Sequence, residues 1–363
     1  MSPQADVLIV GGGVVGLTCA CFRAREGLRV EVVERGEPGQ ESSWAGAGIL
    51  PPASLAHARR PYDRLRALSA DLYPSLSCEL RERTGVDNGY LRCGGLEFVP
   101  ASAPGYEEEW CSEGVACEKL DEQAARELEP ALATGLGAVH YLPELAQLRN
   151  PRHVKALAAL CHLSGVRLHA GCSVSGFEQR QGKVAALSTS SGSLRAGQYL
   201  VAAGAWTGQL LAALGLQVPV RPVRGQIALL NTGVPLFRRV LMLGARYLVP
   251  RPDGRVLIGS TEEEAGFDKR NTAAAIRDLI ELGTSLVPDL AQANLERSWA
   301  GLRPGSPDGM PFLGPAPGFD NLFLAAGHFR AGIQLAPATA QVMTELMAGK
   351  PPSVPLEGFG LER

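Results

Sequence analysis

The stretch "ADVLIVGGGVVGLTCACFRAREGLRVEVVER" (5–35) decides the fold, because it reads as a strand, a glycine-rich turn, a helix and a second strand. The apolar run "DVLIV" leads into Gly11, Gly13 and Gly16, and Val30–Val33 form the next predicted strand. In this G-x-G-x-x-G spacing the first glycine permits a tight turn, the second lets the backbone approach a pyrophosphate, and the third lets helix and strand pack closely. The stretch therefore predicts a Rossmann-type unit with a dinucleotide at the helix N-terminus.

Two features next to this unit indicate how the dinucleotide is held. Glu34 ends the second strand, where its carboxylate can accept hydrogen bonds from a ribose and would repel a 2′-phosphate, so NADP is disfavoured. The segment "ESSWAGAGILPP" (41–52) has two hydroxyls followed by small residues, none of them suited to a helix interior, and is predicted to lie directly along a long cofactor. Ser42 and Ser43 would donate to phosphate oxygens, while the small residues Gly46, Ala47 and Gly48 leave room for a flat ring; an ordinary surface loop is the alternative.

A second strand–glycine–helix pattern near the C-terminus favours FAD over NAD. In residues 321–349 the run "LFLAA" reads as a strand, Gly327 turns it, and a helix is expected to begin within 332–337. The amides of that helix N-terminus would stabilise the negative charge that a flavin ring gains at its N1–C2=O edge on reduction. One cofactor would thus be held at both ends by two helix N-termini.

Composition sets the remaining bounds. A chain of 363 residues with 45% hydrophobic and 20% charged residues suggests a globular protein of two domains. Net charge is -2 without a basic stripe, so nucleic acid is not expected as a partner. No secretory signal is evident, and the uncharged stretch 196–220 is interrupted by Gln, Gly and Pro, so we expect no membrane insertion and a cytoplasmic location. Eight cysteines without a CxxC motif read as reduced, mostly buried thiols.

The middle of the chain divides into two kinds of segment. Residues 150–215 begin with a helix, with Asn150 as its N-cap, and continue with short strands that are expected to rejoin the nucleotide-binding domain. Residues 86–149 and 220–298 contain the strand-like "LEFVP" (96–100) and "AVHYL" (138–142), and a hairpin that turns at Asp253-Gly254. They also contain a helix with one apolar face, formed by Ile276, Leu279, Ile280, Leu286 and Val287. We expect one antiparallel sheet backed by helices.

Five motifs, in this order and spacing, resemble the D-amino acid oxidase (DAO) superfamily of FAD-dependent oxidoreductases, and within it the glycine oxidases of thiamine biosynthesis: "GGGVVG", "SSWAGAGIL", "RYLVPRPDGRVLIGST", "WAGLRPGSPDGMPFLG" and "AAGHFRAGIQLAPAT". The resemblance spans essentially the whole chain. It implies a mixed α/β (α+β) fold with a discontinuous FAD-binding domain (1–85, 150–219 and 299–363) and an inserted antiparallel-sheet substrate domain (86–149 and 220–298). It also implies that Val174 meets the adenine. The full set of expected cofactor-binding residues is Gly11, Gly13, Val14, Val15, Gly16, Glu34, Arg35, Ser42, Ser43, Gly46, Ala47, Gly48, Ile49, Val174, Gly327, His328, Arg330, Ala331, Gly332, Ile333 and Gln334.

Three residues are candidates for catalysis: Arg303, Tyr247 and Arg330. A guanidinium is costly to bury without a partner, and Arg303 lies among small, apolar and turn-forming residues. The resemblance assigns it to the substrate carboxylate, which a planar guanidinium can pair bidentately; a structural arginine between the domains is the alternative. Tyr247 would touch the same carboxylate or be a half-buried sheet tyrosine. Arg330 would contact substrate or flavin through its main chain or form a plain salt bridge, and His328 is expected to position backbone rather than act as a base.

The predicted activity is oxidative deamination of glycine or a small N-substituted glycine, by hydride transfer from Cα to flavin N5. Water then hydrolyses the imine product. O2 takes the electrons from the flavin and is released as H2O2. No general base and no metal site are expected. The segment 303–314 has no cysteine, so FAD is predicted to be non-covalent. Glu262 is expected in a solvated loop, although an inward position would let it hold an amine or a polar N-substituent. A quinone-coupled dehydrogenase, a flavoprotein without turnover and a homo-oligomeric state stay open.

Overall fold

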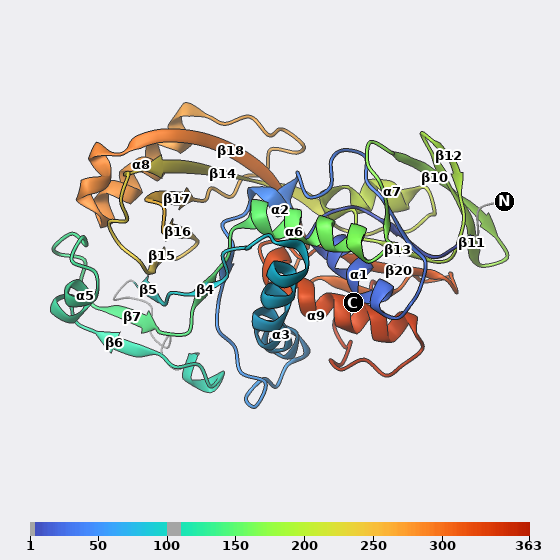
Figure 1. Ribbon diagram of the computed structural model, residues 1–363, viewed down its shortest axis with the longest axis horizontal. Helices are drawn as coiled ribbons and strands as arrows, with labels where there is room; N and C mark the ends of the chain where they lie inside the picture. The colour runs from blue at the N-terminus through green and yellow to red at the C-terminus, as the bar shows by residue number, and fades with distance from the viewer. Residues whose placement is uncertain (1–3, 100–109) are drawn as a thin grey trace.

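Two large sheets lie side by side along the long axis of the molecule in the computed structural model of the chain (Figure 1). The structure describes residues 4–99 and 110–363. The first sheet has the order β19-β20-β13-β1-β2-β9. Its strands are parallel except at the β19–β20 edge, with bounds β1 (Ala5–Val10), β2 (Val30–Val33), β9 (Arg167–His169), β13 (Ala196–Val201), β19 (Phe312–Pro315) and β20 (Leu322–Ala326).

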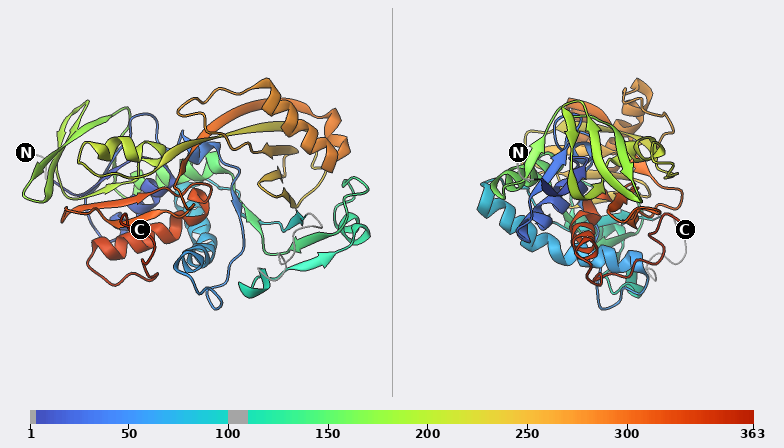
Figure 2. Two further views of the ribbon diagram at one scale, coloured as in Figure 1. Left: turned by 180° about the vertical axis from the view of Figure 1, so that it is seen from behind. Right: turned by 90° about the vertical axis from the view of Figure 1, so that its right-hand side faces the viewer.

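Both faces of this sheet are covered, which is why its first strand is apolar without alternation. Val7 and Ile9 face a layer of four helices, α1 (Val14–Arg25), α3 (Pro61–Thr84), α6 (Asn150–Leu163) and α9 (Gly332–Met347). Leu8 and Val10 pack into a second cluster with α7 (Thr207–Ala212) and with the three-stranded sheet of β10 (Val174–Arg180), β11 (Lys183–Thr189) and β12 (Gly192–Leu194). Figure 2 shows this small sheet at the end of the molecule that carries the N-terminus. The predicted Rossmann-type unit is confirmed.

The second large sheet has eight strands in the order β18-β14-β17-β16-β15-β5-β7-β6. The strands are β5 (Gly95–Phe98), β6 (Glu118–Leu120), β7 (Val139–Leu142), β14 (Arg221–Asn231), β15 (Val240–Leu243), β16 (Arg246–Pro250), β17 (Arg255–Gly259) and β18 (Asn294–Gly305). β5 pairs with β15 in parallel, so the expectation of an entirely antiparallel sheet is wrong at that pair. The reason is that β5 comes from a distant segment and joins the hairpin meander at its edge. Pro100, the last residue of the predicted strand "LEFVP", lies outside the described residues.

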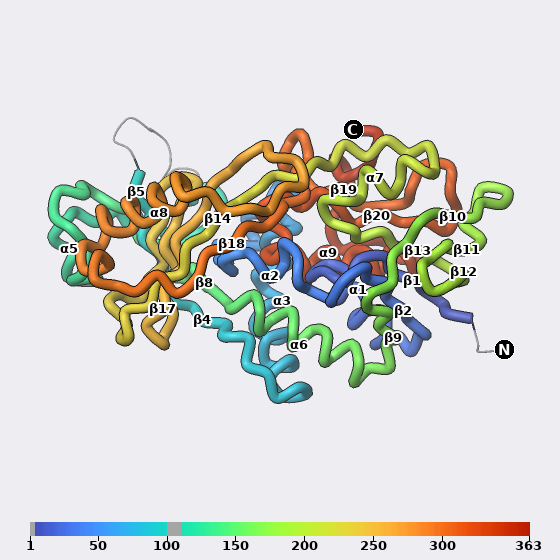
Figure 3. Tube along the Cα trace, turned by 90° about the horizontal axis from the view of Figure 1, so that it is seen from above, coloured from blue at the N-terminus to red at the C-terminus, as the bar shows by residue number. Residues whose placement is uncertain are grey.

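Helix α8 (Ala273–Leu286) covers one face of this sheet with the apolar side that its sequence predicts. The short helix α5 (Glu122–Leu128) and the 3-10 turn Pro288–Gln292 complete that layer. β14 and β18 are the longest strands, and Figure 3 shows them reaching from this sheet to the centre of the molecule, beside α2. The proposed domain limit at residue 299 falls inside β18, and the domain limits stay predictions.

Two local predictions near the centre are wrong. Residues 41–52 were expected not to suit a helix, but the amides of Trp44 and Ala45 both donate to the Glu41 carbonyl and close one helical turn, α2 (Ser42–Ala45). Asn150 is not an N-cap but the first residue of α6; it is fully buried, and its Nδ2 donates to the Ser43 carbonyl at 2.9 Å. A tertiary contact has taken the side chain that capping would have used. α2 is followed by a small sheet, β3 (Ile49–Leu50), β8 (Ala146–Gln147) and β4 (Leu91–Arg92).

All eight cysteines are free thiols, of which four are buried, Cys19, Cys21, Cys161 and Cys172, so half rather than most are inside. In the part of the chain that the structure describes, none of the helices combines the length and the apolar character that crossing a bilayer requires.

A buried arginine ties the second sheet to the centre of the molecule. Arg251 follows β16 and is only 4% exposed. Its Nη2 donates to the Ala47 carbonyl at 2.7 Å, and its Nη1 donates to the Leu148 carbonyl at 2.9 Å and to Gln147 Oε1 at 2.6 Å. Burial lowers the pKa of Arg251 to about 10, chiefly through loss of solvation. The cost of burying the charge is offset by neutral acceptors on two segments, which also pair with each other through β3 and β8.

We therefore expect Arg251→Met to destabilise the fold by about 1–3 kcal/mol, because it leaves buried carbonyl oxygens without donors. Arg251→Lys should recover part of this loss, since one ammonium cannot reach all three acceptors. Urea unfolding monitored by circular dichroism measures the effect, with the exposed Arg152→Met as control. An Arg251→Met protein as stable as the control would show that the three contacts contribute nothing.

Candidate active site

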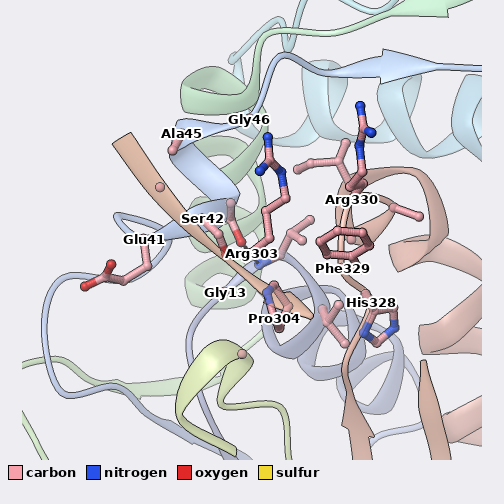
Figure 4. Close-up of a pocket in the computed structure, with 18 of the residues that line it drawn as sticks. Gly13, Glu41, Ser42, Ala45, Gly46, Arg303, Pro304, His328, Phe329 and Arg330 are labelled. Carbon is pink, nitrogen blue, oxygen red and sulfur yellow. Dashed lines mark hydrogen bonds between the residues drawn. The ribbon is translucent and has the colours of Figure 1, made fainter. Parts of the chain in front are cut away.

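A cavity of about 830 Å³ lies where the two large sheets meet. Its wall is formed by the turn before α1, by α2 and the residues after it, by the end of β18, and by the segment between β20 and α9 (Figure 4). The volume is within the range of about 300–1,000 Å³ that is usual for small-molecule sites. The carboxyl ends of β1, β13 and β20 all point toward it, as expected for a ligand site of a doubly wound sheet.

The glycine-rich turn is as tight as its sequence predicts. Gly11 has φ 110°, and a Cβ built on it would lie 2.3 Å from the Ala202 carbonyl oxygen. A Cβ on Gly16 would lie 1.9 Å from the Gly11 carbonyl oxygen. Gly16 does not line the cavity, which agrees with its predicted part in helix–strand packing. Only glycine fits at either position without moving the backbone.

The N-terminus of α1 faces the cavity with no side-chain cap from Gly13. The amide of Val14 donates to Ser43 Oγ at 2.9 Å. Because this bond uses a lone pair of the hydroxyl, the hydroxyl hydrogen of Ser43 remains available to an anion. The helix end and the serine together form an anion-binding corner.

The carboxylate of Glu34 is fixed by backbone amides. Its Oε2 accepts from Gly12 N at 2.8 Å and its Oε1 accepts from Gly36 N at 3.0 Å. Next to it, Arg35 lies over the Trp206 ring at 3.6 Å and pairs with Glu41 at 3.1 Å. Carboxylate oxygens have further lone pairs, so Glu34 can still accept from ligand hydroxyls.

Features at the other end of the cavity also fit a long cofactor. The N-terminus of α9 lacks a side-chain cap, and Gly332 is its first residue. Gln334 Nε2 and Asn150 Oδ1 are buried, line the cavity and have no hydrogen-bond partner among the described residues. Buried polar atoms without partners are uncommon in folded proteins, and a ligand in the cavity would supply partners. The residues present therefore fit a dinucleotide such as FAD.

Apart from Gly16, every residue expected to bind the cofactor lines this cavity. Their individual roles stay predictions. Sequence reasoning missed Trp206, Arg246, Gly225 and Ser260, which also line it. Arg246 and Ser260 had a signal, since both lie in the recognised motif "RYLVPRPDGRVLIGST". Trp206 and Gly225 lie outside the five motifs, and their positions depend on how distant segments pack.

Arg303 lies on β18, and its guanidinium points into the cavity (Figure 4). Nη1 donates to the Thr261 carbonyl at 3.1 Å, and Nη2 donates to Ser260 Oγ at 2.5 Å. Among the described residues Arg303 has no ion pair. Burial lowers its pKa from the ordinary value, opposed in part by Tyr247. A half-buried cation held only by neutral acceptors is suited to bind an anionic ligand.

Two glycines make room for this arrangement. A Cβ on Gly225, in β14, would lie 2.3 Å from Arg303 Nη2. A Cβ on Gly259, in β17, would lie 2.8 Å from the Tyr247 hydroxyl and ring. Tyr247 is paired directly with Gly259 in the sheet, and its hydroxyl acts on the Arg303 charge. Because Gly225 and Gly259 have no side chains, the Arg303 guanidinium and the Tyr247 ring can lie close to the strand backbone.

Arg330 lies beside Arg303, with its guanidinium pointing in the same direction (Figure 4). Its Nη2 donates to the Ala245 carbonyl at 2.7 Å, and its Nη1 is 3.7 Å from Glu262 Oε2. Both side chains are partly exposed, Arg330 at 38% and Glu262 at 49%. Glu262 does not line the cavity, so in this structure it contacts Arg330 rather than a ligand. These side-chain contacts agree with the second of the two expectations for Arg330, that it forms a salt bridge.

Residues 261–269 cross from one end of the site to the other. Thr261 holds Arg303, and Glu263 pairs with the buried Arg224. Phe267 stacks on Trp206 at 5.4 Å, and Lys269 pairs with Glu41 at 3.0 Å. We call residues 261–269 the strap, since it joins the arginine end to the nucleotide end.

His328 is buried below the two arginines and is not an acid or base for the cavity. Its Nε2 is 3.1 Å from Thr339 Oγ1 in α9. Burial lowers the pKa of His328 to about 3 and that of His153 to about 4. Both rings are therefore neutral in the fold, and His328 joins the turn to the helix.

These pKa values predict an acid-sensitive fold. An unfolded histidine takes up a proton near pH 6.5, whereas in the fold His328 does so near pH 3 and His153 near pH 4. Between pH 6.5 and these lower values the unfolded state therefore binds more protons than the folded state. The free energy of unfolding of the ligand-free protein should fall by about 1.4 kcal/mol per pH unit for each of them below pH 6.5.

His328→Asn should remove about one proton from the pH dependence between pH 6 and 4.5, a window above the ordinary pKa of the carboxylates. The exposed His162→Asn is the control. Urea unfolding across this window measures the slope. Equal slopes for the wild type and His328→Asn would contradict a neutral buried His328.

The chain is similar to proteins of known family and structure. The family described as FAD dependent oxidoreductase (DAO) matches residues 6–346. The chain is 40% identical to a glycine oxidase of Pseudomonas putida over 356 residues, which are 98% of this chain and 97% of the relative. The crystal structure of glycine oxidase from Geobacillus kaustophilus matches with a TM-score of 0.94 at 34% identity over 99% of both chains. An iminodiacetate oxidase from Chelativorans sp. BNC1 matches with a TM-score of 0.86 at 28% identity over 98% of both. The chain therefore belongs to the DAO family of FAD-dependent oxidoreductases, and its cofactor is FAD.

Proposed function

We propose that the protein oxidises glycine or a small N-substituted glycine and passes the electrons to O2. The single observation that carries this proposal is the half-buried guanidinium of Arg303, which faces the cavity without an ion pair among the described residues. A substrate carboxylate is the partner it lacks. The similarity to proteins named glycine oxidase supports the amino acid, and the similarity to a protein named iminodiacetate oxidase supports N-substituted glycines.

The chain's own residues would bind and orient the substrate. Arg303 pairs with the carboxylate, and the Tyr247 hydroxyl donates to it from the neighbouring strand, which fixes the direction of the Cα–H bond. FAD, when bound, supplies the acceptor for the two electrons and the hydrogen that leave Cα. His328 is bonded to Thr339, so we assign no base to the site; the amine reacts in its neutral form.

We propose the following residues as the cofactor's contacts. The α1 N-terminus and Ser43 would hold the pyrophosphate, Glu34 the adenosine ribose and Val174 the adenine. The α9 N-terminus and the unpartnered Gln334 amide would meet the flavin ring. Non-covalent attachment, a cytoplasmic location and the oligomeric state stay predictions.

The two alternative functions are less well supported. Arg303 and Tyr247 both line the cavity, whereas a flavoprotein without turnover would have no use for them there. A quinone-coupled dehydrogenase finds no specific support in the similarity to proteins named oxidases.

Turnover tests the proposal. The purified holoprotein should consume O2 with glycine or N-methylglycine and form H2O2 and glyoxylate in equal amounts. Acid precipitation should leave the yellow cofactor in the supernatant. Anaerobic bleaching of the flavin without peroxide formation in air would favour the quinone-coupled enzyme, and no bleaching with any amino acid would refute the proposal.

Arg303→Ala should reduce kcat/KM for glycine by roughly 30- to several-thousand-fold, because losing one member of a buried charge pair costs about 2–5 kcal/mol. Arg303→Lys should recover only part, since an ammonium lacks two parallel donors. Flavin content and melting temperature are the controls for folding. Wild-type kinetics in a well-folded Arg303→Ala protein would remove Arg303 from the site.

A further inference from the structure

The charged residues that line the cavity are sorted by sign. The two carboxylates, Glu34 and Glu41, lie at the nucleotide end with Arg35. Among residues 4–99 and 110–363, the other charged side chains in the wall are arginines: Arg66, Arg246, Arg303 and Arg330. A wall of this kind attracts anions and raises their local concentration.

The chain itself neutralises only part of this positive charge. Arg66 is paired with Glu113 through bonds of 3.1 and 3.2 Å. Arg303 and Arg246 have no ion pair among residues 4–99 and 110–363. Arg330 has one loose carboxylate neighbour, Glu262, at 3.7 Å and outside the cavity wall. A single substrate carboxylate on Arg303 would therefore leave positive charge at the site.

Arg330 contacts the turn that immediately precedes Arg246. Arg330 donates to the carbonyl of Ala245, the residue before Arg246, and both arginines line the cavity. The guanidinium of Arg330 points the same way as that of Arg303 (Figure 4). Burial has the largest effect on the pKa of Arg303, and Tyr247 has the next largest. Arg330 comes third and lowers this pKa, because the two positive charges are near each other. One small molecule could contact both.

We infer that Arg330, with Arg246 beside it, forms a second anion subsite, which accepts the acidic N-substituent of a glycine derivative whose first carboxylate is on Arg303. This inference rests on the proposed function and narrows it to dicarboxylic N-substituted glycines as good substrates. Glu262 is the internal competitor: its carboxylate occupies Arg330 loosely when no ligand does. The subsite is partly exposed, so its contribution will be screened by salt.

The reaction of such a substrate balances without a further reactant. For N-(carboxymethyl)glycine one Cα–H bond breaks and its two electrons pass by way of FAD to O2, which is reduced to H2O2. Water then cleaves the resulting C=N bond, so that one O2 and one water give glyoxylate, glycine and H2O2. The released glycine is itself a substrate, so complete oxidation consumes two O2.

Matched ligands separate binding at the subsite from turnover. N-methylglycine and N-(carboxymethyl)glycine differ only in the second carboxylate. Methoxyacetate and diglycolate are their oxygen analogues, which lack the amine and cannot be deaminated. Initial rates give kcat/KM for the first pair, and flavin absorbance changes on titration give Kd for the second pair.

Arg330→Met in the holoprotein should lower the preference for the dicarboxylate over the monocarboxylate at least about tenfold at low salt, in both the kcat/KM and the Kd ratio. Arg330→Lys should restore part of the preference. Glu262→Gln should raise it, because the competing carboxylate is gone. The exposed Arg277→Met, which removes one positive charge from α8, should leave both ratios unchanged.

The outcomes distinguish this inference from the proposed function. If N-methylglycine is oxidised but Arg330→Met and Glu262→Gln leave both ratios unchanged, the subsite is wrong and the oxidase stands. If Arg330→Met affects both ligands of each pair equally, the charge serves a step common to them and the subsite is again wrong. If the Kd ratios change as expected but no amino acid is oxidised, the subsite stands and the proposed function fails.

Discussion

The central constraint in this structure is the half-buried guanidinium of Arg303, which no carboxylate among the described residues neutralises. Arg303 is held by the Thr261 carbonyl and the Ser260 hydroxyl, which accept from two of its donors without cancelling its charge. Placing a cation this way costs desolvation energy, and a fold keeps it only when the surrounding backbone fixes the geometry. Here the pairing of β14 with β18 and β17 does so, with Gly225 and Gly259 leaving the necessary space.

The same strand pairing connects the substrate end to the cofactor end. β17 leads directly into the strap, whose first residue holds Arg303 and whose later residues contact Trp206 and Glu41. Arg251 adds a second tie by holding the carbonyl of Ala47, a residue of the cavity wall. The position of Arg303 relative to the nucleotide end is thus set by two independent connections between sheets rather than by one flexible hinge.

Some of this could be predicted from sequence because the signal is local. The turn 11–16 and the start of α9 depend on glycines within a few residues, and both lie where the patterns place them. The predictions for Asn150 and for the segment 41–52 are wrong because the two conformations depend on each other. The side-chain amide of Asn150 donates a hydrogen bond to the Ser43 carbonyl, which is distant in the sequence. Gly225 has no local motif at all. The reason for a glycine at this position is visible only in the sheet, where the pairing of β14 with β18 places Gly225 beneath the Arg303 side chain.

The two ends of the cavity use different kinds of positive potential, and the difference has a physical consequence. At the cofactor end the helix N-termini supply partial charges that belong to the backbone and therefore stay in place. At the substrate end the charges are full and are carried by side chains, so a flexible carboxylate such as Glu262 can approach one of them. A cofactor that stays bound suits the first arrangement, because its charge is always present. A substrate that enters and leaves at every turnover suits the second, because the empty site can partly neutralise itself between one substrate and the next.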